Sequence, residues 1–388
     1  MSNSSDTYQV VIVGGGPVGL FLGICLEKAG IPVIILEERN KIRSGSRSLG
    51  IHPVSLELFQ EVGIAHNFVE AGIKIFKGHA FANEQKLGTI SFGDCPKPYN
   101  FILALPQKQT EHILEKSAQN LSSVLLRRGA KVTGINQKDE HIEVSYLSDG
   151  KSNTIEASFL VGCDGKDSFV RRRSGISFEG SNYPDTYIMG DFSDNTSLGS
   201  DAAIFLCDDG VIESFPLQGN RRRWVVKTSH YLSEVKRKDI ERRVDRRIGH
   251  NLEETNQFML SSFGVQKFVA RPMVNNRIIV AGDAAHVVSP IGGQGMNLGW
   301  LGAWDLAQCM IQIFDQQKSP AKILEEFENR RQKAARNAIR RAEVNMRLGR
   351  KTRLTLLRNS LIYLMLHTPL SKVMGRIYTM RGLEKWIF

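Results

Sequence analysis

Apolar runs and helical patterns alternate along the N-terminal part of this chain. Residues 8–13 form an apolar run short enough for a strand that is buried on both faces of a parallel sheet. Residues 20–29 then show a helical pattern, and Gly30 stands where a helix is expected to end. A second apolar run covers residues 33–36. This order predicts a strand, a turn, a helix and a second buried strand.

The turn between the first strand and the helix is rich in glycine. Gly14 permits a tight turn, Gly16 lets the backbone approach a pyrophosphate, and Gly19 lets the helix pack close to the strand. The amides at the start of the helix would face the phosphates. Glu37 lies 18 residues beyond Gly19 and can accept hydrogen bonds from a ribose diol. The pattern predicts an adenine dinucleotide site made by Gly14, Gly15, Gly16, Pro17, Val18, Gly19, Glu37 and Glu38.

A second segment with an acid and glycines lies late in the chain. Asp283 follows the apolar run 277–281, a loop with three glycines comes next, and a helical pattern covers residues 296–314. The amides of a glycine loop that enters a helix supply fixed positive dipoles for a bound anion. The alternative is a plain surface loop. Two such segments far apart in the sequence predict one large ligand held from both ends. The expected contacts here are Asp283, Pro290, Gly292, Gly293, Gly295, Met296 and Asn297.

A third stretch, residues 161–171, completes a set of motifs. In their order along the chain, the three segments resemble those of the para-hydroxybenzoate hydroxylase family of flavin monooxygenases, and the resemblance extends to about residue 340. It implies FAD as the cofactor, with the pyrophosphate at the first turn, the ribityl chain at Asp283 and the isoalloxazine ring along residues 290–297. It also implies that the middle stretch, through Asp164 and Gly165, takes part in binding both FAD and NAD(P)H.

The same resemblance implies three further cofactor residues. Residues 45–50 look like the arginine-bearing loop of the family, in which Arg47 would lie by the flavin and the pyrophosphate. Gln107 is similar to the glutamine of the family that meets the cofactor, and Val132 is assigned to the cofactor site on the resemblance as well.

One position departs from the pattern of that family. The family usually places an acid within the turn after the asparagine that matches Asn297, whereas this chain has Gly302 there and an acid only at Asp305. The departure hardly affects the expectation of FAD binding. It leaves open how the helix behind the glycine loop is oriented.

The middle of the chain changes to alternation typical of strands. Runs at 203–206, 211–215 and 223–228 are separated by turn signals. We expect an α/β fold like that of para-hydroxybenzoate hydroxylase, in which an antiparallel sheet is inserted into a three-layer Rossmann-like domain. The expected FAD-binding domain comprises residues 1–72, 103–180 and 272–330, the substrate-binding sheet residues 73–102 and 181–271, and a basic helical C-terminal segment residues 331–388.

Catalytic side chains are harder to find than cofactor residues. His52 and Arg47 are weak catalytic candidates because they are expected near the flavin. Five scattered cysteines show neither metal-ligand nor disulfide spacing, and we expect no metal site. Within the predicted sheet a packing or surface role is favoured for each of His79, Tyr99, Tyr187, Trp224 and His230.

Positive charge is concentrated at the C-terminus. Residues 330–388 hold 15 Lys and Arg but only two acids, although the whole chain has a net charge of +11. The apolar run 361–366 is too short to span a bilayer. Basic helices followed by an apolar run suit a segment that lies on an anionic membrane surface. Alternatively, the apolar side packs on the core and the arginines are solvated. No nucleic-acid recognition motif accompanies the charge.

The function expected from these features is that of an FAD-dependent, NAD(P)H-using monooxygenase. Its partners would be O2 and an aromatic, quinone-like or polycyclic substrate. The polar N-terminus carries no signal sequence, so we expect a cytoplasmic enzyme whose basic C-terminus is the part that would contact a membrane. Two alternatives stay open: a flavin-dependent reductase of isoprenoid lipids, and a flavoprotein without turnover that binds a reactive intermediate. The choice between NADH and NADPH, the substrate and the oligomeric state are also open.

Overall fold

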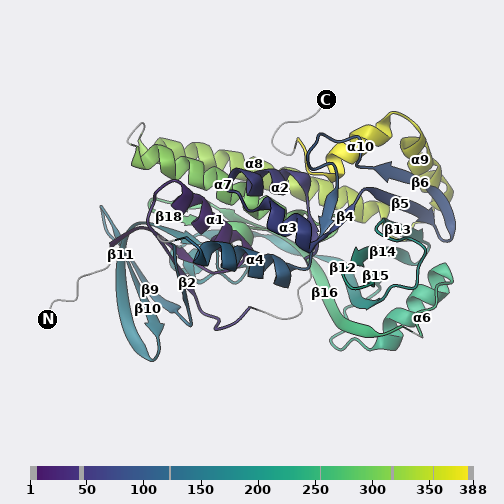
Figure 1. Ribbon diagram of the computed structural model, residues 1–388, viewed down its shortest axis with the longest axis horizontal. Helices are drawn as coiled ribbons and strands as arrows, with labels where there is room; N and C mark the ends of the chain where they lie inside the picture. Colours follow the sequence, from purple (N-terminus) through teal and green to yellow (C-terminus); the bar gives the residue numbers. More distant parts are fainter. Residues whose placement is uncertain are drawn as a thin grey trace.

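Two eight-stranded sheets lie side by side along the long axis of the molecule, with helices packed against them (Figure 1). The structure is a computed structural model, and it describes residues 7–42, 48–121, 124–253, 255–315, 319–352 and 354–382.

The first sheet has a parallel core. Its strand order is β17-β18-β11-β1-β2-β8, and β9 and β10 extend it from β11 in antiparallel pairing. Val13 pairs with Leu36 and with Gly162, and Gly162 pairs with Val280, so these strands end at the same edge of the sheet. The strands are β1 (Thr7–Val13), β2 (Val33–Glu37), β8 (Val124–Arg128), β9 (Lys131–Gln137), β10 (Ile142–Ser148), β11 (Lys151–Gly162), β17 (Val274–Asn275) and β18 (Ile278–Val280).

Different elements cover the two faces of this sheet. Leu20, Leu114 and Trp300, from three helices, bury one face together with residues of β1 and β2. The other face packs against β9, β10 and a short helix, through residues such as Val144 and Val170. The result is the expected three-layer arrangement. The helices are α1 (Pro17–Lys28), α2 (Pro53–Glu61), α3 (Ala65–Ala71), α4 (Gln107–Gln119), α5 (Phe169–Arg173) and α7 (Gln294–Phe314).

The second sheet has the order β19-β16-β12-β15-β14-β13-β5-β6 and is antiparallel except between β5 and β13. The runs predicted at 203–206, 211–215 and 223–228 are confirmed as its strands β13, β14 and β15. Helix α6 (Arg237–Ile248) covers one face. The strands are β5 (Lys77–Ala82), β6 (Gln85–Ser91), β12 (Ser177–Ser193), β13 (Ala202–Cys207), β14 (Gly210–Leu217), β15 (Arg221–Thr228), β16 (Gln257–Arg271) and β19 (His286–Val287).

A two-stranded ribbon connects the two sheets. Strands β12 and β16 pair antiparallel from Ser177 with Arg271 to Phe192 with Gln257, and the register shifts between Asn182 and Thr186. The expected boundaries at 180 and 271 therefore fall on this ribbon. The shorter insertion leaves from a small sheet of β3 (Gly50–Ile51), β4 (Ile73–Ile75) and β7 (Ile102–Ala104), with the order β3-β7-β4, and returns to it.

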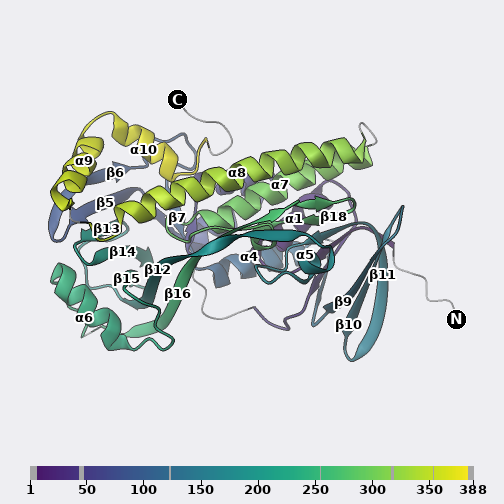
Figure 2. The same cartoon turned by 180° about the vertical axis from the view of Figure 1, so that it is seen from behind.

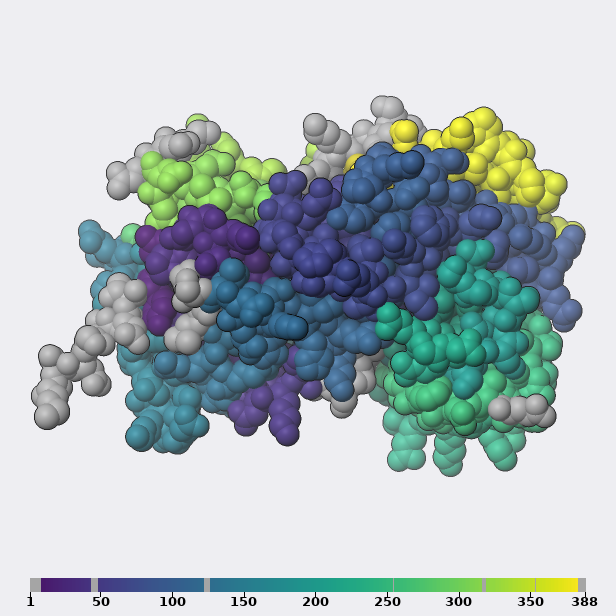
Figure 3. Space-filling view, in the orientation of Figure 1, coloured from purple at the N-terminus to yellow at the C-terminus, as the bar shows by residue number. Residues whose placement is uncertain are grey.

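The C-terminal helices lie along both sheets. Helix α8 (Pro320–Leu348) runs lengthwise over the molecule in both views (Figures 1 and 2). The basic segment was expected to begin at residue 331, but this position lies inside α8, because the helix begins at Pro320 and continues without a break. Helices α9 (Thr355–His367) and α10 (Leu370–Tyr378) pack on β6 at one end of the molecule (Figure 3). Within the described ranges, no helix combines the length and the apolar character needed to cross a bilayer.

Candidate functional site

The first glycine turn lies against the middle motif. Gly14 has φ +107°, and a Cβ atom on it would overlap the carbonyl oxygen of Cys163. A Cβ atom on Gly19 would overlap the carbonyl oxygen of Gly14. The amide of Cys163 donates to the carbonyl of Val13 over 2.7 Å. These contacts leave no room for a side chain at either glycine, and they hold residues 163–165 beside the start of α1.

The first turn also contacts the late segment. The side chain of Val18 lies between two glycines, where it is 3.0 Å from a Cβ built on Gly282 and 2.6 Å from one built on Gly299. The indole nitrogen of Trp300 donates to the carbonyl of Pro17 over 3.0 Å. The two segments that the sequence separates widely are therefore packed together at the N-terminus of α1.

Arg171 connects the middle motif to the late one. Its guanidinium donates to the carbonyl oxygens of Ala284 (2.9 Å) and Lys166 (2.7 Å), and it lies 3.7 Å from the ring centre of Phe178. Burial lowers the pKa of Arg171, but the two carbonyls satisfy the charge. Arg171 was not among the residues expected to bind the cofactor, although it is the last residue of the stretch 161–171. An arginine at the end of a motif that begins in a buried strand was the available signal.

Beside this junction the backbone is open in a way that fits a pyrophosphate. A Cβ atom on Gly16 or on Gly165 would meet no atom within 4 Å. The first backbone amides of α1 lie at this open position. Gly16 is the N-cap of the helix, and no side chain accepts hydrogen bonds from these amides as a cap. One carboxylate oxygen of Asp164 accepts from Val170, while the other is buried and has no partner among the described residues. An open backbone and an unsatisfied oxygen indicate room for a polar ligand.

Glu37 and Glu38 differ in their surroundings. The carboxylate of Glu37 accepts hydrogen bonds from the amide of Gly15 (2.7 Å) and from the backbone and guanidinium of Arg39. Burial alone would raise the pKa of Glu37, but these hydrogen bonds and the charge of Arg39 lower it. Glu37 is therefore ionised and held beside the glycine turn. Glu38 is exposed and pairs with Lys131 at the surface.

Gln107 and Val132 occupy different places as well. The backbone amide of Gln107 donates to the carbonyl of Ser48, and its side chain donates to Glu111 over 2.7 Å. Burial raises the pKa of Glu111, whose second oxygen has no partner within the described ranges. Val132 is instead buried in the core beneath the opposite face of the first sheet, with Leu36. Arg47 lies outside the described residues.

Asp283 lies in a short 3₁₀ turn, η1 (Gly282–Ala284), directly after β18. Its side chain keeps access to solvent, yet protein atoms surround it closely. This desolvation raises the pKa of Asp283 to about 6, and the charge of Lys166 opposes the shift. An accessible acid in such surroundings fits a position at the floor of a ligand site.

The glycine loop is held in place by Asn297 and His52. Gly292 and Gly293 have φ values of +90° and +66°, and Gly293 caps helix α7. The side-chain nitrogen Nδ2 of Asn297 donates to the carbonyls of Gly293 (2.8 Å) and Gly50 (2.9 Å). Its oxygen accepts from the backbone of His52 and from the hydroxyl of Ser55, both over 2.8 Å. Asn297 is fully buried, and its hydrogen-bonding capacity is used within the protein.

The imidazole of His52 is neutral. Burial lowers its pKa to about 4, although backbone groups of Gly292, Gly293 and Tyr378 act in the opposite direction. Its Nε2 lies 3.2 Å from the carbonyl oxygen of Gly292, which can only accept, so Nε2 carries the hydrogen. The other ring nitrogen is buried and lacks a partner in the part of the chain that the structure describes. It is left as an acceptor.

The departure at Gly302 has a structural counterpart one turn later. A Cβ atom on Gly302 would lie 3.6 Å from the side chain of Arg331 on α8. Asp305 pairs with Arg331 (2.9 Å) and with Arg330 (2.8 Å). The acid at Asp305 therefore fixes the orientation of α7 against α8.

The residues weighed in the predicted sheet mostly have partners. His79 contacts Asp201 and Thr89, each over 2.9 Å, and Trp224 is buried under α6. Exposed His230 contacts Ser229. His286 is buried, and burial lowers its pKa to about 4.

Glu213 on β14 is a second polar residue that the sequence pattern did not single out. It is 7% exposed, and burial raises its pKa to about 7. Tyr187 on β12 is 1% exposed, and its hydroxyl has no partner among the described residues. The only sequence signal was an acid within an apolar strand.

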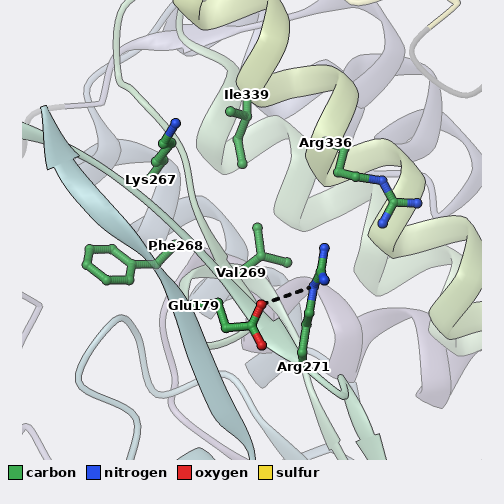
Figure 4. Close-up of a pocket in the computed structure, with 8 residues that line it drawn as sticks. Glu179, Lys267, Phe268, Val269, Arg271, Arg336 and Ile339 are labelled. Carbon is green, nitrogen blue, oxygen red and sulfur yellow. Dashed lines mark ion pairs between the residues drawn. The ribbon is translucent and has the colours of Figure 1, made fainter.

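A separate hollow of about 300 Å³ opens where β12 and β16 pass α8 (Figure 4). Four charged residues are among those that line it: Arg271 and Glu179, which form an ion pair of 3.6 Å, and Lys267 and Arg336. None of its lining residues is an expected cofactor residue. In the described ranges no group of three or more His, Cys, Asp or Glu could hold a metal ion.

Residues 7–342 match the family model described as FAD binding domain. An uncharacterized aromatic compound monooxygenase of Bacillus subtilis is 32% identical over 88% of this chain and 68% of its own length. A rifampicin monooxygenase of Streptomyces venezuelae is 29% identical over 77% of this chain and 63% of its own length. The chain thus spans about two thirds of the length of these relatives.

A p-nitrophenol 4-monooxygenase from Pseudomonas putida has a similar structure, with a TM-score of 0.88 over 98% of this chain and 100% of that one. At 21% identity, this likeness concerns the fold. The expected para-hydroxybenzoate hydroxylase-like architecture is confirmed.

Proposed function

Because the chain belongs to the FAD binding domain family of flavin-dependent aromatic monooxygenases, we propose that it uses NAD(P)H and O2 to hydroxylate an aromatic or polycyclic substrate. The observation that carries this proposal is the junction of the three motifs. Val18 contacts Gly282 and Gly299, Gly14 lies on Cys163, and Arg171 reaches Ala284. FAD is the cofactor of the family, and we assign the groups at this junction to it.

In this proposal each part of the junction binds a different part of FAD. The open backbone at Gly16 and the first amides of α1 bind the pyrophosphate, and ionised Glu37 accepts from the adenosine ribose. Asp283 accepts from the ribityl chain, and the amides of the loop 290–297 face the ring. When bound, FAD supplies the redox and oxygen-transfer chemistry. Asn297 and His52 act as positioning residues that hold the loop.

The structure supports the remaining expected cofactor contacts unequally. Gly165 lies open beside Asp164, where FAD or NAD(P)H could approach. The backbone of Gln107 donates to Ser48, the residue that directly follows Arg47 in the sequence. The surface position of Glu38 and the buried position of Val132 favour structural roles for those two side chains.

The relatives favour a monooxygenase over the two alternatives. They are named as monooxygenases of an aromatic compound and of rifampicin, and an aromatic substrate with O2 agrees with both names. Neither name indicates an isoprenoid reductase or a flavoprotein without turnover.

The test is a purification followed by a substrate screen. We expect a yellow protein whose NAD(P)H oxidation accelerates with an aromatic or quinone compound and whose product gains one oxygen atom from ¹⁸O2. Anaerobic turnover of a polyprenyl lipid would favour the reductase. Bound flavin that neither NADH nor NADPH reduces, with or without aromatic compounds, would favour the binding protein.

We also infer that α9 and α10 contact an anionic membrane surface. The sequence between residues 344 and 383 has eight Lys and Arg and no acid. One side of α9 packs on the second sheet through Ile362 and Leu366. Its other side and α10 expose large apolar residues: Leu354, Leu356, Leu357, Leu361, Tyr363, Leu364, Leu370, Val373 and Ile377. Exposed Lys372 and Arg376 lie among them, and this combination suits an interface with acidic lipids.

Vesicle co-sedimentation tests this contact. The protein should sediment with vesicles that contain phosphatidylglycerol at low salt, and not with phosphatidylcholine alone. The triple change Leu356→Ser, Leu361→Ser, Leu364→Ser should abolish sedimentation, whereas Phe258→Ser, at an exposed apolar residue of β16, should not. Failure to sediment at low salt would exclude the membrane. A dimer in light scattering that the triple change dissociates would assign the surface to a second copy.

A further inference from the structure

Two polar side chains on the second sheet are buried without protein partners. Glu213 is 7% exposed, and its carboxyl group makes neither a hydrogen bond nor an ion pair with the described part of the chain. Tyr187 is 1% exposed, with an unsatisfied hydroxyl. Burying an unpaired carboxyl group costs several kcal/mol when it is ionised. A folded protein that keeps such a pair has a free-energy cost that a bound ligand could offset.

The surroundings of Glu213 are apolar. On β14 it stands between Val211 and Phe215, and across the sheet it is opposite Ile204 and Val225. None of these neighbours offers a side-chain hydrogen bond. An apolar wall with one polar group is how small-molecule sites fix the orientation of a ligand.

This face of the sheet is directed at the glycine loop. Tyr187, Val211 and Val225 belong to one buried cluster with Ile291 of the loop and Met346 of α8. The ring of Tyr187 stacks on Phe263 at 5.4 Å, which fixes the direction of its hydroxyl.

The charges of Glu213 and of nearby groups act on one another. Burial is the main cause that raises the pKa of Tyr187, and the charge of Glu213 adds to it. The same two causes raise the pKa of Tyr378 on α10. Tyr378 in turn contacts Asn345 on α8 through its hydroxyl, at 3.4 Å. The backbone of Tyr378 interacts with His52. The charge of Glu213 on β14 is thus felt both by Tyr187 of the sheet and by Tyr378 of α10.

Cations on neighbouring positions of this sheet and on α8 are held by other acids. Asp185 binds Lys227 (2.6 Å) and Arg350 (3.1 Å), and Asp191 binds Arg223 through both oxygens. Asp191 balances the charge of Arg223, whereas Asp185 carries one negative charge against two cations and holds both of them in place. A substrate carboxylate brought to Glu213 would meet a like charge, whereas a hydroxyl or an ammonium group would find an acceptor.

We propose that Glu213 and Tyr187 together bind a hydrogen-bond-donating group of the aromatic substrate, an amino or a hydroxyl group, and that they select against substrates with a carboxylate at that end. This proposal rests on the proposed function, since it assigns the sheet face above the loop to substrate.

Three small phenols of similar shape test the selection: 4-hydroxybenzylamine, 4-hydroxybenzyl alcohol and 4-hydroxyphenylacetate. Dissociation constants come from the change that each compound causes in the flavin absorbance of the holoenzyme. We expect the amine or the alcohol to bind at least about tenfold more tightly than the acid, the range of a hydrogen bond to a charged group. The comparison of amine with alcohol distinguishes the two donors.

Variants separate Glu213 from the general properties of the site. Glu213→Gln should reduce the preference of the amine over the acid by about tenfold or more, and Tyr187→Phe should weaken binding of the preferred donor severalfold. Glu179→Gln removes a glutamate of β12 on the ribbon and should leave the preference unchanged. Wild-type affinity for the amine should rise with pH as Glu213 ionises near pH 7, and Glu213→Gln should lose this rise.

Several outcomes would overturn the proposal. Binding of the acid as tightly as the amine and the alcohol is one, and an unchanged preference in Glu213→Gln is another. Failure of all three phenols to bind, while other aromatic compounds accelerate NAD(P)H oxidation, is a third. A protein without flavin, or one that no aromatic compound stimulates, would contradict the proposed function instead.

Discussion

The side-chain oxygen of Asn297 accepts a hydrogen bond from the backbone N–H of His52 over 2.8 Å, across 245 positions of sequence. The same side chain reaches Gly50 and Gly293, so one amide joins the small sheet to the start of α7. Hydrogen bonds within the protein thus fix the loop on which a flavin ring is proposed to lie.

Replacing Asn297 tests this connection. Asn297→Leu keeps the approximate volume but leaves the backbone groups of His52, Gly50 and Gly293 buried and unsatisfied. Each lost partner costs about 1–3 kcal/mol, so we expect a clear fall in the thermal unfolding temperature and loss of bound FAD. Calorimetry and the flavin content of the purified protein measure the two effects. Asn136→Leu, at an exposed asparagine, is the control, and equal behaviour of the two variants would refute the connecting role.

Two glycines of the first turn should respond differently to alanine. Gly19→Ala places a methyl group on the carbonyl of Gly14, so we expect misfolding or strong destabilisation. Gly16→Ala meets no protein atom, so the apoprotein should keep its stability while its FAD affinity falls at least about tenfold. Thermal unfolding of the apoprotein and FAD titration separate the two results. Gly264→Ala, also in open space, should change neither quantity; if Gly16→Ala bound FAD normally, the pyrophosphate would have to lie elsewhere.

Asp283 should matter for cofactor retention more than for folding. Its side chain is accessible and raises no packing problem on removal, so Asp283→Ala should fold normally. If the carboxylate accepts from the ribityl chain, the variant should lose about tenfold in FAD affinity. Flavin fluorescence during dialysis follows the loss. Full occupancy in the variant would show that Asp283 does not contact the cofactor.

Glu213 should make stability depend on pH. Its pKa of about 7 in the folded protein lies above the ordinary value of 4.5, so between these values the folded state holds a proton that the unfolded state releases. The free energy of unfolding therefore falls as the pH rises through this window. Glu213→Gln removes the fall and should be more stable than the wild type at pH 8, by roughly 3 kcal/mol, but not at pH 4. Urea denaturation at both pH values measures the difference. A constant difference between the proteins would mean that the pKa of Glu213 is the same in the folded and the unfolded state.

The fold around the first glycine turn could be predicted because its sequence signals are local. A buried strand, a glycine turn and a helix start within a short stretch, and the hydrophobic pattern over residues 8–36 contains all three. The substitution at Gly302 could be noticed but not interpreted. The acid one turn later, Asp305, pairs with Arg331 and so joins α7 to α8. The contact between these two helices cannot be read from the sequence pattern of either one.

The substrate contacts proposed for the second sheet could not be predicted from the sequence, for a physical reason. The strand of Glu213 is apolar on both faces, so its alternation does not reveal which side meets ligand. Burial of Glu213 depends on packing with α8, α10 and the loop near Ile291, all distant in sequence. The expected start of the basic segment at residue 331 follows the change in charge, whereas the helix that carries this charge, α8, begins at Pro320.

The ribbon of β12 and β16 allows the larger insertion of the second sheet to be exchanged as one unit. The larger inserted segment enters on one strand and leaves on its hydrogen-bonded neighbour, so both junctions lie side by side, near Thr186 and Gly264. A graft between relatives at these two positions would keep the strand register and replace β13 to β15, with Glu213, in one step. The chemistry of the flavin half would then be coupled to a new substrate wall, which makes this ribbon a natural splice point for recombination within the family.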